Sequence, residues 1–200
     1  MALNTIEALR KALDDAYRLD YPAATIDLAH RLLQIDPENS LAWLRLGTML
    51  SETAKYDEAE QALRMALCHC SQAKRHLVFG LMGFLFKNRG DYEEAAEWFR
   101  AVIDAKPDDA DGHIWLGGVF ARKGELIEAE YVYRKATMCK NGCIDEAYHN
   151  LGLVLRAQGK IDEALQCFEK AIAIDPGYKE AKHALADVKA AIGYRSEATT

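Results

Sequence analysis

The chain has 200 residues, half of them apolar or aromatic, which is enough to bury a sizeable core and excludes a disordered polymer. Its formal net charge of -6 argues against a general nucleic-acid or membrane-surface binder, because both need a basic face. The first thirty residues carry five carboxylates and no continuous apolar stretch, so we expect neither a secretory signal nor a membrane span.

Apolar residues recur at three- and four-residue spacing along the chain, which is typical of amphipathic helices. Each of five successive segments reads as two helices joined by a turn, and the segments are 6–39, 40–75, 76–109, 110–144 and 145–178. A further amphipathic helix at 179–192 has a polar outer side that suits a cap on the last apolar interface. We therefore expect one solenoid over residues 1–193 and a disordered tail over 194–200.

Small residues recur at fixed places in these segments. Glycine in mid-helix costs about 0.5–1 kcal/mol relative to alanine, so a glycine repeated at one position needs a repeated reason. Close crossing of the two helices of a segment supplies that reason. The glycines of the first helices are Gly47, Gly83, Gly117 and Gly152, and the matching small residues of the second helices are Ala59, Ala95, Ala129 and Ala164.

The spacing of Leu151-Gly152, Ala164, Phe168 and Pro176 resembles the tetratricopeptide repeat, in which L-G, A-x3-F and a closing proline recur over about 34 residues. The resemblance implies an all-α fold, a right-handed superhelix of antiparallel helix pairs whose concave groove is lined by the first helix of each pair. It also implies protein–protein recognition without catalysis. The first segment departs from the pattern, with Asp20 at the turn and Thr25 at the small position.

Four of the five cysteines end second helices that lack the closing proline, namely Cys68, Cys70, Cys139 and Cys143. Zinc sites commonly use a C-x2–4-C pair matched by a second pair, whereas one residue separates Cys68 from Cys70 and the other two cysteines lie two segments away. A disulfide between Cys139 and Cys143 is geometrically possible. We expect no metal site here, reduced structural thiols in a cytoplasmic protein, and Cys167 in the core.

Catalytic motifs are missing from the sequence. It contains no phosphate-binding glycine loop, no G-x-S-x-G and no H-E-x-x-H. His113 stands where other segments carry Trp43 and Tyr148, so packing is its expected role, while His149 and His183 recur at one groove position. We therefore expect a protein without enzymatic activity or cofactor, in which a weak metal or proton-sensitive patch at His149 is the remaining alternative.

The resemblance also assigns groove-facing positions to the first helices. They are Arg10, Leu41, Leu44, Arg45, Leu77, Phe84, Asp111, Ile114, Trp115, Glu146 and His149. Six of these residues are apolar, and contiguous exposed apolar patches mark binding sites. We expect a non-catalytic adaptor or scaffold whose groove binds an apolar or amphipathic peptide of a partner protein. The alternative is a structural homo-oligomer that self-associates through the same surface.

Two further expectations concern the ligand. Repeat proteins that bind chaperone tails use a clamp of Lys, Asn and Arg, and the equivalent positions here include Asp14, Leu77 and Leu81, so chaperone tails are not the expected ligand. Charge complementarity places an acidic end of the peptide beside Arg10 and Arg45. Protonation of His149 toward pH 6 is expected to weaken binding of its basic end.

Overall fold

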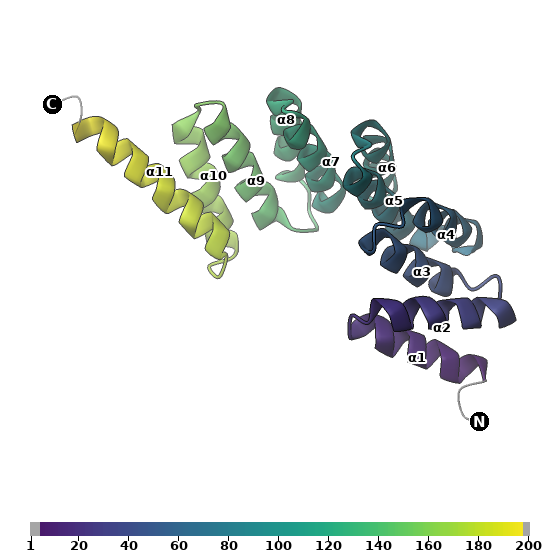
Figure 1. The fold of residues 1–200 in the computed structure, drawn as a ribbon. Helices are drawn as coiled ribbons and strands as arrows, with labels where there is room; N and C mark the ends of the chain where they lie inside the picture. The colour runs from purple at the N-terminus through teal and green to yellow at the C-terminus, as the bar shows by residue number, and fades with distance from the viewer. Residues whose placement is uncertain (1–4, 198–200) are drawn as a thin grey trace. The chain divides into compact units, whose positions relative to one another are not determined.

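The structure, a computed structural model, describes residues 5–197 and their side chains as far as Ile192. Within these residues the fold is all-α, with eleven α-helices, one short 3-10 helix and no strand (Figure 1). The chain forms two compact units, Met1–Trp98 and Phe99–Thr200, and the boundary between them falls inside α6. The fold class predicted from the repeats is confirmed, whereas a single continuous solenoid remains a prediction.

The first unit holds the helices of the first two segments and the start of the third. They are α1 (Ile6–Arg18), α2 (Pro22–Ile35), α3 (Ser40–Glu52), α4 (Tyr56–His69), the 3-10 helix Gln72–Lys74, α5 (Arg75–Arg89) and the beginning of α6 (Tyr92–Ala105). Consecutive helices from α1 to α5 pack against one another. Helix α4 ends at His69, and the next residue, Cys70, has an extended backbone.

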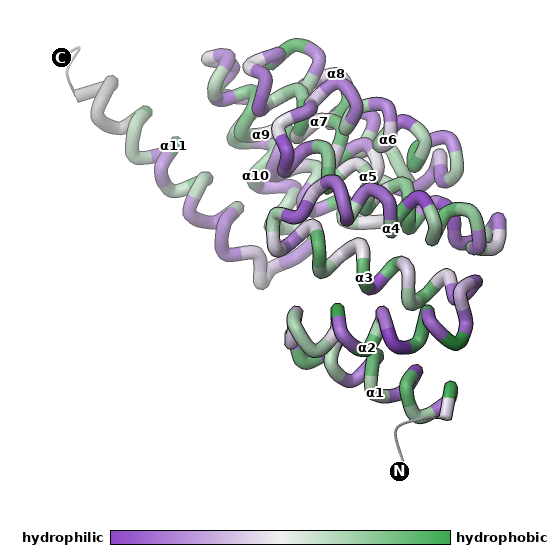
Figure 2. Tube along the Cα trace, turned by 45° about the vertical axis from the view of Figure 1, so that its right-hand side comes forward, coloured by the Kyte–Doolittle hydropathy of each residue, from purple (hydrophilic) through white to green (hydrophobic). Residues whose placement is uncertain are grey.

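The second unit continues from α6 with α7 (Ala110–Lys123), α8 (Leu126–Ala136), α9 (Ile144–Ala157), α10 (Ile161–Ile174) and α11 (Lys179–Glu197). Helix α11 packs against α10 in the place predicted for the capping helix. It extends beyond residue 192, where the sequence suggested an end, and residues 198–200 of the predicted tail lie outside the described part. Apolar and polar segments alternate along the helices of both units (Figure 2).

Side-chain caps and turns define the helix ends. The side chains of Thr5, Asn39 and Asp109 accept hydrogen bonds from backbone N–H groups of the first turns of α1, α3 and α7. The turn after α7 uses a left-handed glycine, Gly124 with φ 80°. The same turn in the second segment is made by Ala54 with φ 60°, a conformation that is strained for a residue with a Cβ.

The two helices of a repeat cross as closely as the small residues predict. A Cβ on Gly152 of α9 would lie 2.6 Å from Cε1 of Phe168 in α10, and one on Gly47 of α3 would lie 2.7 Å from Cγ of Leu63 in α4. Phe168 is completely buried, and so is Ala164 one turn earlier. Close packing of this kind fixes the helix pairs and therefore the positions of the surfaces that they present.

Candidate functional site

The first unit exposes leucines on its first helices. Leu41 in the first turn of α3 is 42 % exposed and Leu77 in the first turn of α5 is 49 % exposed, whereas Leu44 is half-buried. A pocket of about 250 Å³ opens beside Leu41, and it is lined by Arg10, Leu13, Asp14, Leu32, Asn39 and Leu41. The structure thus brings two predicted site residues, Arg10 and Leu41, into one concave feature between α1 and α3.

Arg10 already forms an ion pair with a carboxylate of its own unit. Its Nη2 donates to Oδ2 of Asp36 at 2.8 Å, and Nδ2 of Asn39 donates to the same oxygen at 2.9 Å. These hydrogen bonds hold the pKa of the Asp36 carboxyl below its ordinary value, and the bond from Asn39 has a larger effect than the bond from Arg10. An acidic ligand at Arg10 would have to compete with a carboxylate that is already in place.

Arg45 is held in a similar way by α1. Its Nη2 lies 3.4 Å from Oδ1 of Asp14, and its guanidinium carbon lies 3.6 Å from the centre of the Tyr17 ring. Stacking on an aromatic face and pairing with a carboxylate are both favourable for guanidinium. The sequence predicts that Arg10 and Arg45 bind the acidic end of a ligand. In the structure both guanidinium groups already contact carboxylates of the first unit.

Phe84 completes the predicted residues of the first unit. It is half-buried on α5, and the Nζ of Lys87 lies 4.5 Å from the centre of its ring. The remaining predicted residues, Asp111, Ile114, Trp115, Glu146 and His149, belong to the second unit. Each group is therefore a candidate surface on its own unit.

The prediction that Ile114 faces the groove is wrong. Ile114 of α7 is only 4 % exposed and belongs to the core with Ala147 and Leu151 of α9. Helix α9 packs on that side of α7, so the isoleucine is covered by the next repeat. Trp115, its neighbour, is half-buried, with its ring centre 5.7 Å from that of Phe99.

Asp111 is held by the loop that joins α8 to α9. Its Oδ1 accepts a hydrogen bond from the backbone N–H of Cys143 at 3.1 Å. The same loop contacts the start of α7 through the backbone, because the N–H of Ala110 donates to the carbonyl of Asn141 at 2.9 Å. Asp111 is half-buried, so its role here is structural as well as electrostatic.

Glu146 and His149 are both half-buried, and they stand one turn apart on α9. Burial raises the pKa of Glu146, and the nearby carboxylates Asp111 and Asp145 add to the effect. The Nδ1 of His149 lies 3.1 Å from the hydroxyl of Tyr178, and burial lowers the pKa of this histidine. Protonation of His149 near pH 6, which the sequence suggested, is therefore shifted to lower pH.

The cysteines show no common site. All five thiols are free, with Cys68 and Cys143 exposed and Cys167 buried in the core as predicted. Among the described residues, no three side chains of His, Cys, Asp or Glu are grouped so that they could hold a metal ion. Burial and the neighbouring Asp111 raise the pKa of the Cys143 thiol to about 11.

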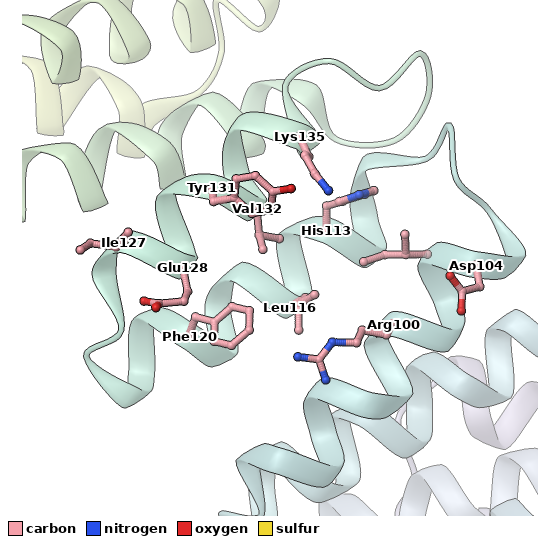
Figure 3. Close-up of a pocket in the computed structure, with 11 residues that line it drawn as sticks. Arg100, Asp104, His113, Leu116, Phe120, Ile127, Glu128, Tyr131, Val132 and Lys135 are labelled. Carbon is pink, nitrogen blue, oxygen red and sulfur yellow. The ribbon is translucent and has the colours of Figure 1, made fainter.

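A larger pocket of the second unit was missed by the sequence analysis. It has a volume of about 620 Å³ and lies between the last turns of α6 and helices α7 and α8 (Figure 3). His113, predicted to pack, is 8 % exposed at its wall, and burial lowers its pKa. The pocket is lined by Arg100, Ile103, Asp104, His113, Leu116, Phe120, Ile127, Glu128, Tyr131, Val132 and Lys135.

No helix in the described part of the chain is both long enough and apolar enough to cross a membrane.

Three models of the tetratricopeptide repeat match the sequence, over residues 30–61, 83–142 and 145–178. Together these matches cover well over half of the chain.

Curated relatives match over short parts of their length. The chain is 27 % identical over 136 residues to human protein O-mannosyl-transferase TMTC1, which is 68 % of this chain and 15 % of that protein. It is 30 % identical over 148 residues to the Tmtc3 protein O-mannosyl-transferase of Drosophila melanogaster, 74 % of this chain and 16 % of that protein. The chain thus spans about a sixth of the length of these relatives.

Solved structures share the fold at low sequence identity. The C-terminal part of a TPR repeat-containing protein from Cytophaga hutchinsonii superposes with a TM-score of 0.76 at 19 % identity, over 94 % of this chain and 72 % of that one. YrrB, described as a TPR protein with an unusual peptide-binding site, gives a TM-score of 0.63 at 18 % identity, over 90 % and 92 % of the two chains. Both likenesses concern the arrangement of helices.

Proposed function

The chain belongs to the tetratricopeptide repeat family, and from this premise we propose that it is a non-catalytic scaffold that binds an apolar or amphipathic peptide segment of a partner protein. Proteins built from such repeats generally mediate protein–protein interaction, and stacked repeats present extended surfaces for that purpose. The peptide-binding site named for YrrB supports the same class of ligand, in a protein of similar fold.

The observation that carries the proposal is the exposure of Leu41 and Leu77. Both residues stand in the first turns of first helices, beside the completely or almost completely buried Ala42 and Val78. Burial of a leucine side chain is favourable by about 1.5–3 kcal/mol, and this free energy is available only when a partner covers it. The pocket beside Leu41 gives one side chain of a peptide a place to insert.

The expected affinity is modest. Association costs on the order of 4–15 kcal/mol, and the burial of Ile114 removes one of the apolar groups that the sequence assigned to the surface. Two exposed leucines and the half-buried Leu44 therefore support micromolar or weaker binding. A peptide with apolar residues matches this surface better than an acidic one, because Arg10 and Arg45 already contact carboxylates.

Catalysis is not part of the proposal. The transferase activity in the names of the relatives belongs to proteins of which this chain matches about a sixth. The sequence contains none of the hydrolase or nucleotide-binding motifs considered above. Its acidic charge suits a protein partner better than a nucleic acid, and its thiols suit a cytoplasmic scaffold.

A display library of short random peptides, captured on the intact protein, tests the proposal. Selected peptides should be rich in apolar residues and should bind the Leu41→Glu/Leu77→Glu variant at least about tenfold more weakly. Ile35→Glu is the matched control, because Ile35 is an equally exposed apolar residue at the end of a second helix. Equal binding by the wild type and the double variant would show that the surface of α3 and α5 is not the site.

A further inference from the structure

Helix α8 carries large apolar residues at two outward positions that are polar or charged in the second, third and fifth repeats. Ile127 is 76 % exposed and Tyr131 is 61 % exposed. When the repeats are aligned on their buried alanines, the positions equivalent to Ile127 hold Asp57, Glu93 and Asp162. The positions equivalent to Tyr131 hold Gln61, Glu97 and Gln166. The second, third and fifth repeats thus carry polar or charged residues at both positions, as a solvated helix face does, and the fourth repeat differs at both.

These two side chains border the pocket of about 620 Å³ in the second unit. Leu116 and Phe120 of α7 and Val132 of α8 form its apolar lining, and Arg100 and Asp104 lie across from them on α6 (Figure 3). Leu116 and Val132 are almost completely buried, so the pocket opens directly onto the core. An aromatic or branched side chain from outside can therefore be buried here together with Ile127 and Tyr131.

Charges around the pocket balance. Arg100 and Lys135 contribute two positive charges, and Asp104 and Glu128 contribute two negative ones, whereas the whole chain carries -6. Glu128 and Lys135 are seven residues apart on α8, so their Cα atoms lie about 10 Å apart along the helix, before and after Tyr131. The Nζ of Lys135 lies 4.5 Å from the centre of the Tyr131 ring of the same chain. This arrangement is self-complementary. When two copies of α8 pack antiparallel, Glu128 of each copy lies opposite Lys135 of the other.

We propose that this face of α8 is a self-association surface and that its occupant is a second copy of the chain. In a two-fold dimer, α8 of one copy packs antiparallel on α8 of the other, with the axis near Tyr131. Glu128 then faces Lys135 of the second copy, and Ile127 and Tyr131 cover the second copy's pocket. Two acidic chains repel least where their surfaces are neutral, and this surface is neutral.

The proposal goes beyond the peptide-binding function, because it uses α8 and leaves α3 and α5 untouched. Its first test is sedimentation equilibrium of the intact chain from about 1 to several hundred micromolar, a range suited to weak association. The wild type should approach twice the monomer mass as the concentration rises. The Ile127→Asp/Tyr131→Gln variant should stay monomeric over the same range.

The double variant is chosen to fold normally, because the fifth repeat carries Asp162 and Gln166 at the same positions. An unchanged melting temperature and undiminished capture of the peptides selected for α3 and α5 would confirm this. Ile35→Glu, at an exposed apolar residue of the first unit, should leave the dimer intact. A strictly monomeric wild type, or a dimer that the double variant does not weaken, overturns the proposal.

Charge reversal tests the antiparallel arrangement. Glu128→Lys and Lys135→Glu should each weaken the dimer by about tenfold or more, because each places like charges opposite one another twice. Combining both changes in one chain should restore the wild-type affinity, and mixing the two single variants should give a heterodimer. Failure of the combined variant to recover would contradict this pairing of α8 helices.

Discussion

Gly117 of α7 lies against the ring of Tyr133 in α8 so closely that a Cβ on the glycine would stand 2.7 Å from Cε1 of the ring. Tyr133 is 4 % exposed and is enclosed by the core of the second unit. The ring cannot move aside without disturbing that core. Glycine at position 117 is thus a requirement of the helix crossing and not of the helix itself.

Replacing Gly117 by alanine should destabilise the protein by about 1–3 kcal/mol, because overpacking outweighs the better helix propensity. The next residue provides a matched control, since a Cβ on Gly118 would meet only the Tyr133 hydroxyl, at an ordinary 3.6 Å. Gly118→Ala should therefore stabilise the protein by about 0.5–1 kcal/mol. Urea unfolding measures both, and a gain in stability for Gly117→Ala would disprove close crossing.

The turn at Ala54 offers a stabilising change. Ala54 has φ 60° between α3 and α4, whereas Gly159 makes the same turn between α9 and α10 with φ 80°. A left-handed conformation costs a residue with a Cβ about 1–2 kcal/mol, and glycine avoids this cost. Ala54→Gly should raise the free energy of unfolding by up to about 1 kcal/mol, after the greater chain entropy of glycine is subtracted.

The reverse substitution, Gly159→Ala, controls for packing. A Cβ at Gly159 would have no atom within 4 Å, so its effect is purely conformational and should be destabilising by about 1 kcal/mol. Thermal unfolding of the two variants at one pH gives both values. Shifts of the same sign would show that the left-handed backbone is not what decides stability at these turns.

Repeat spacing predicted the helix pairs, the glycine turns and the close crossings, because all three follow from residues at fixed separations. It did not predict the burial of Ile114, which depends on how closely α9 packs on α7. The ion pair between Arg10 and Asp36 joins residues 26 positions apart in the sequence, so no local pattern predicts it. Comparison of the repeats at Ile127 and Tyr131 could have revealed the α8 surface from the sequence alone.

Acid should destabilise the second unit through His149. Burial lowers the pKa of this histidine in the folded chain, opposed by Glu180 and assisted by Arg156. As the pH falls through about 6.5, His149 therefore binds a proton in the unfolded chain before it does so in the folded chain. Protonation thus favours the unfolded state, and the free energy of unfolding decreases. The stability contributed by the neutral histidine is complete above pH 6.5 and is lost progressively as the pH falls toward the lowered folded value.

Urea unfolding at pH 7.5, 6.5 and 5.5 should show this loss in the wild type, and it should be smaller in His149→Gln. Titration of the His149 ring by NMR should give a midpoint below that of an unfolded reference peptide. His113, whose pKa is also lowered by burial, contributes in the same direction and accounts for part of the loss that remains in the variant. A midpoint for His149 above 6.5 would contradict its neutral state in the fold.

The last prediction concerns the reactivity of Cys143. This thiol is exposed, yet burial of its sulfur and then the carboxylate of Asp111 raise its pKa to about 11. Because the thiolate is the reactive form, alkylation by iodoacetamide at pH 8 should be much slower than for a free cysteine with a pKa near 8.5. Asp111→Asn removes the negative charge while its side-chain oxygen can still accept the N–H of Cys143.

The variant should therefore lower the pKa of Cys143 and speed its alkylation, by up to tenfold for each pH unit of the shift. Mass spectrometry of the peptide that contains Cys143 measures the rate apart from the other four cysteines. Asp145→Asn is a useful control, because Asp145 is the last of the carboxylates that raise this pKa and should change the rate less. Rapid alkylation of the wild type would contradict the protonated thiol and reopen a redox role for the loop between α8 and α9.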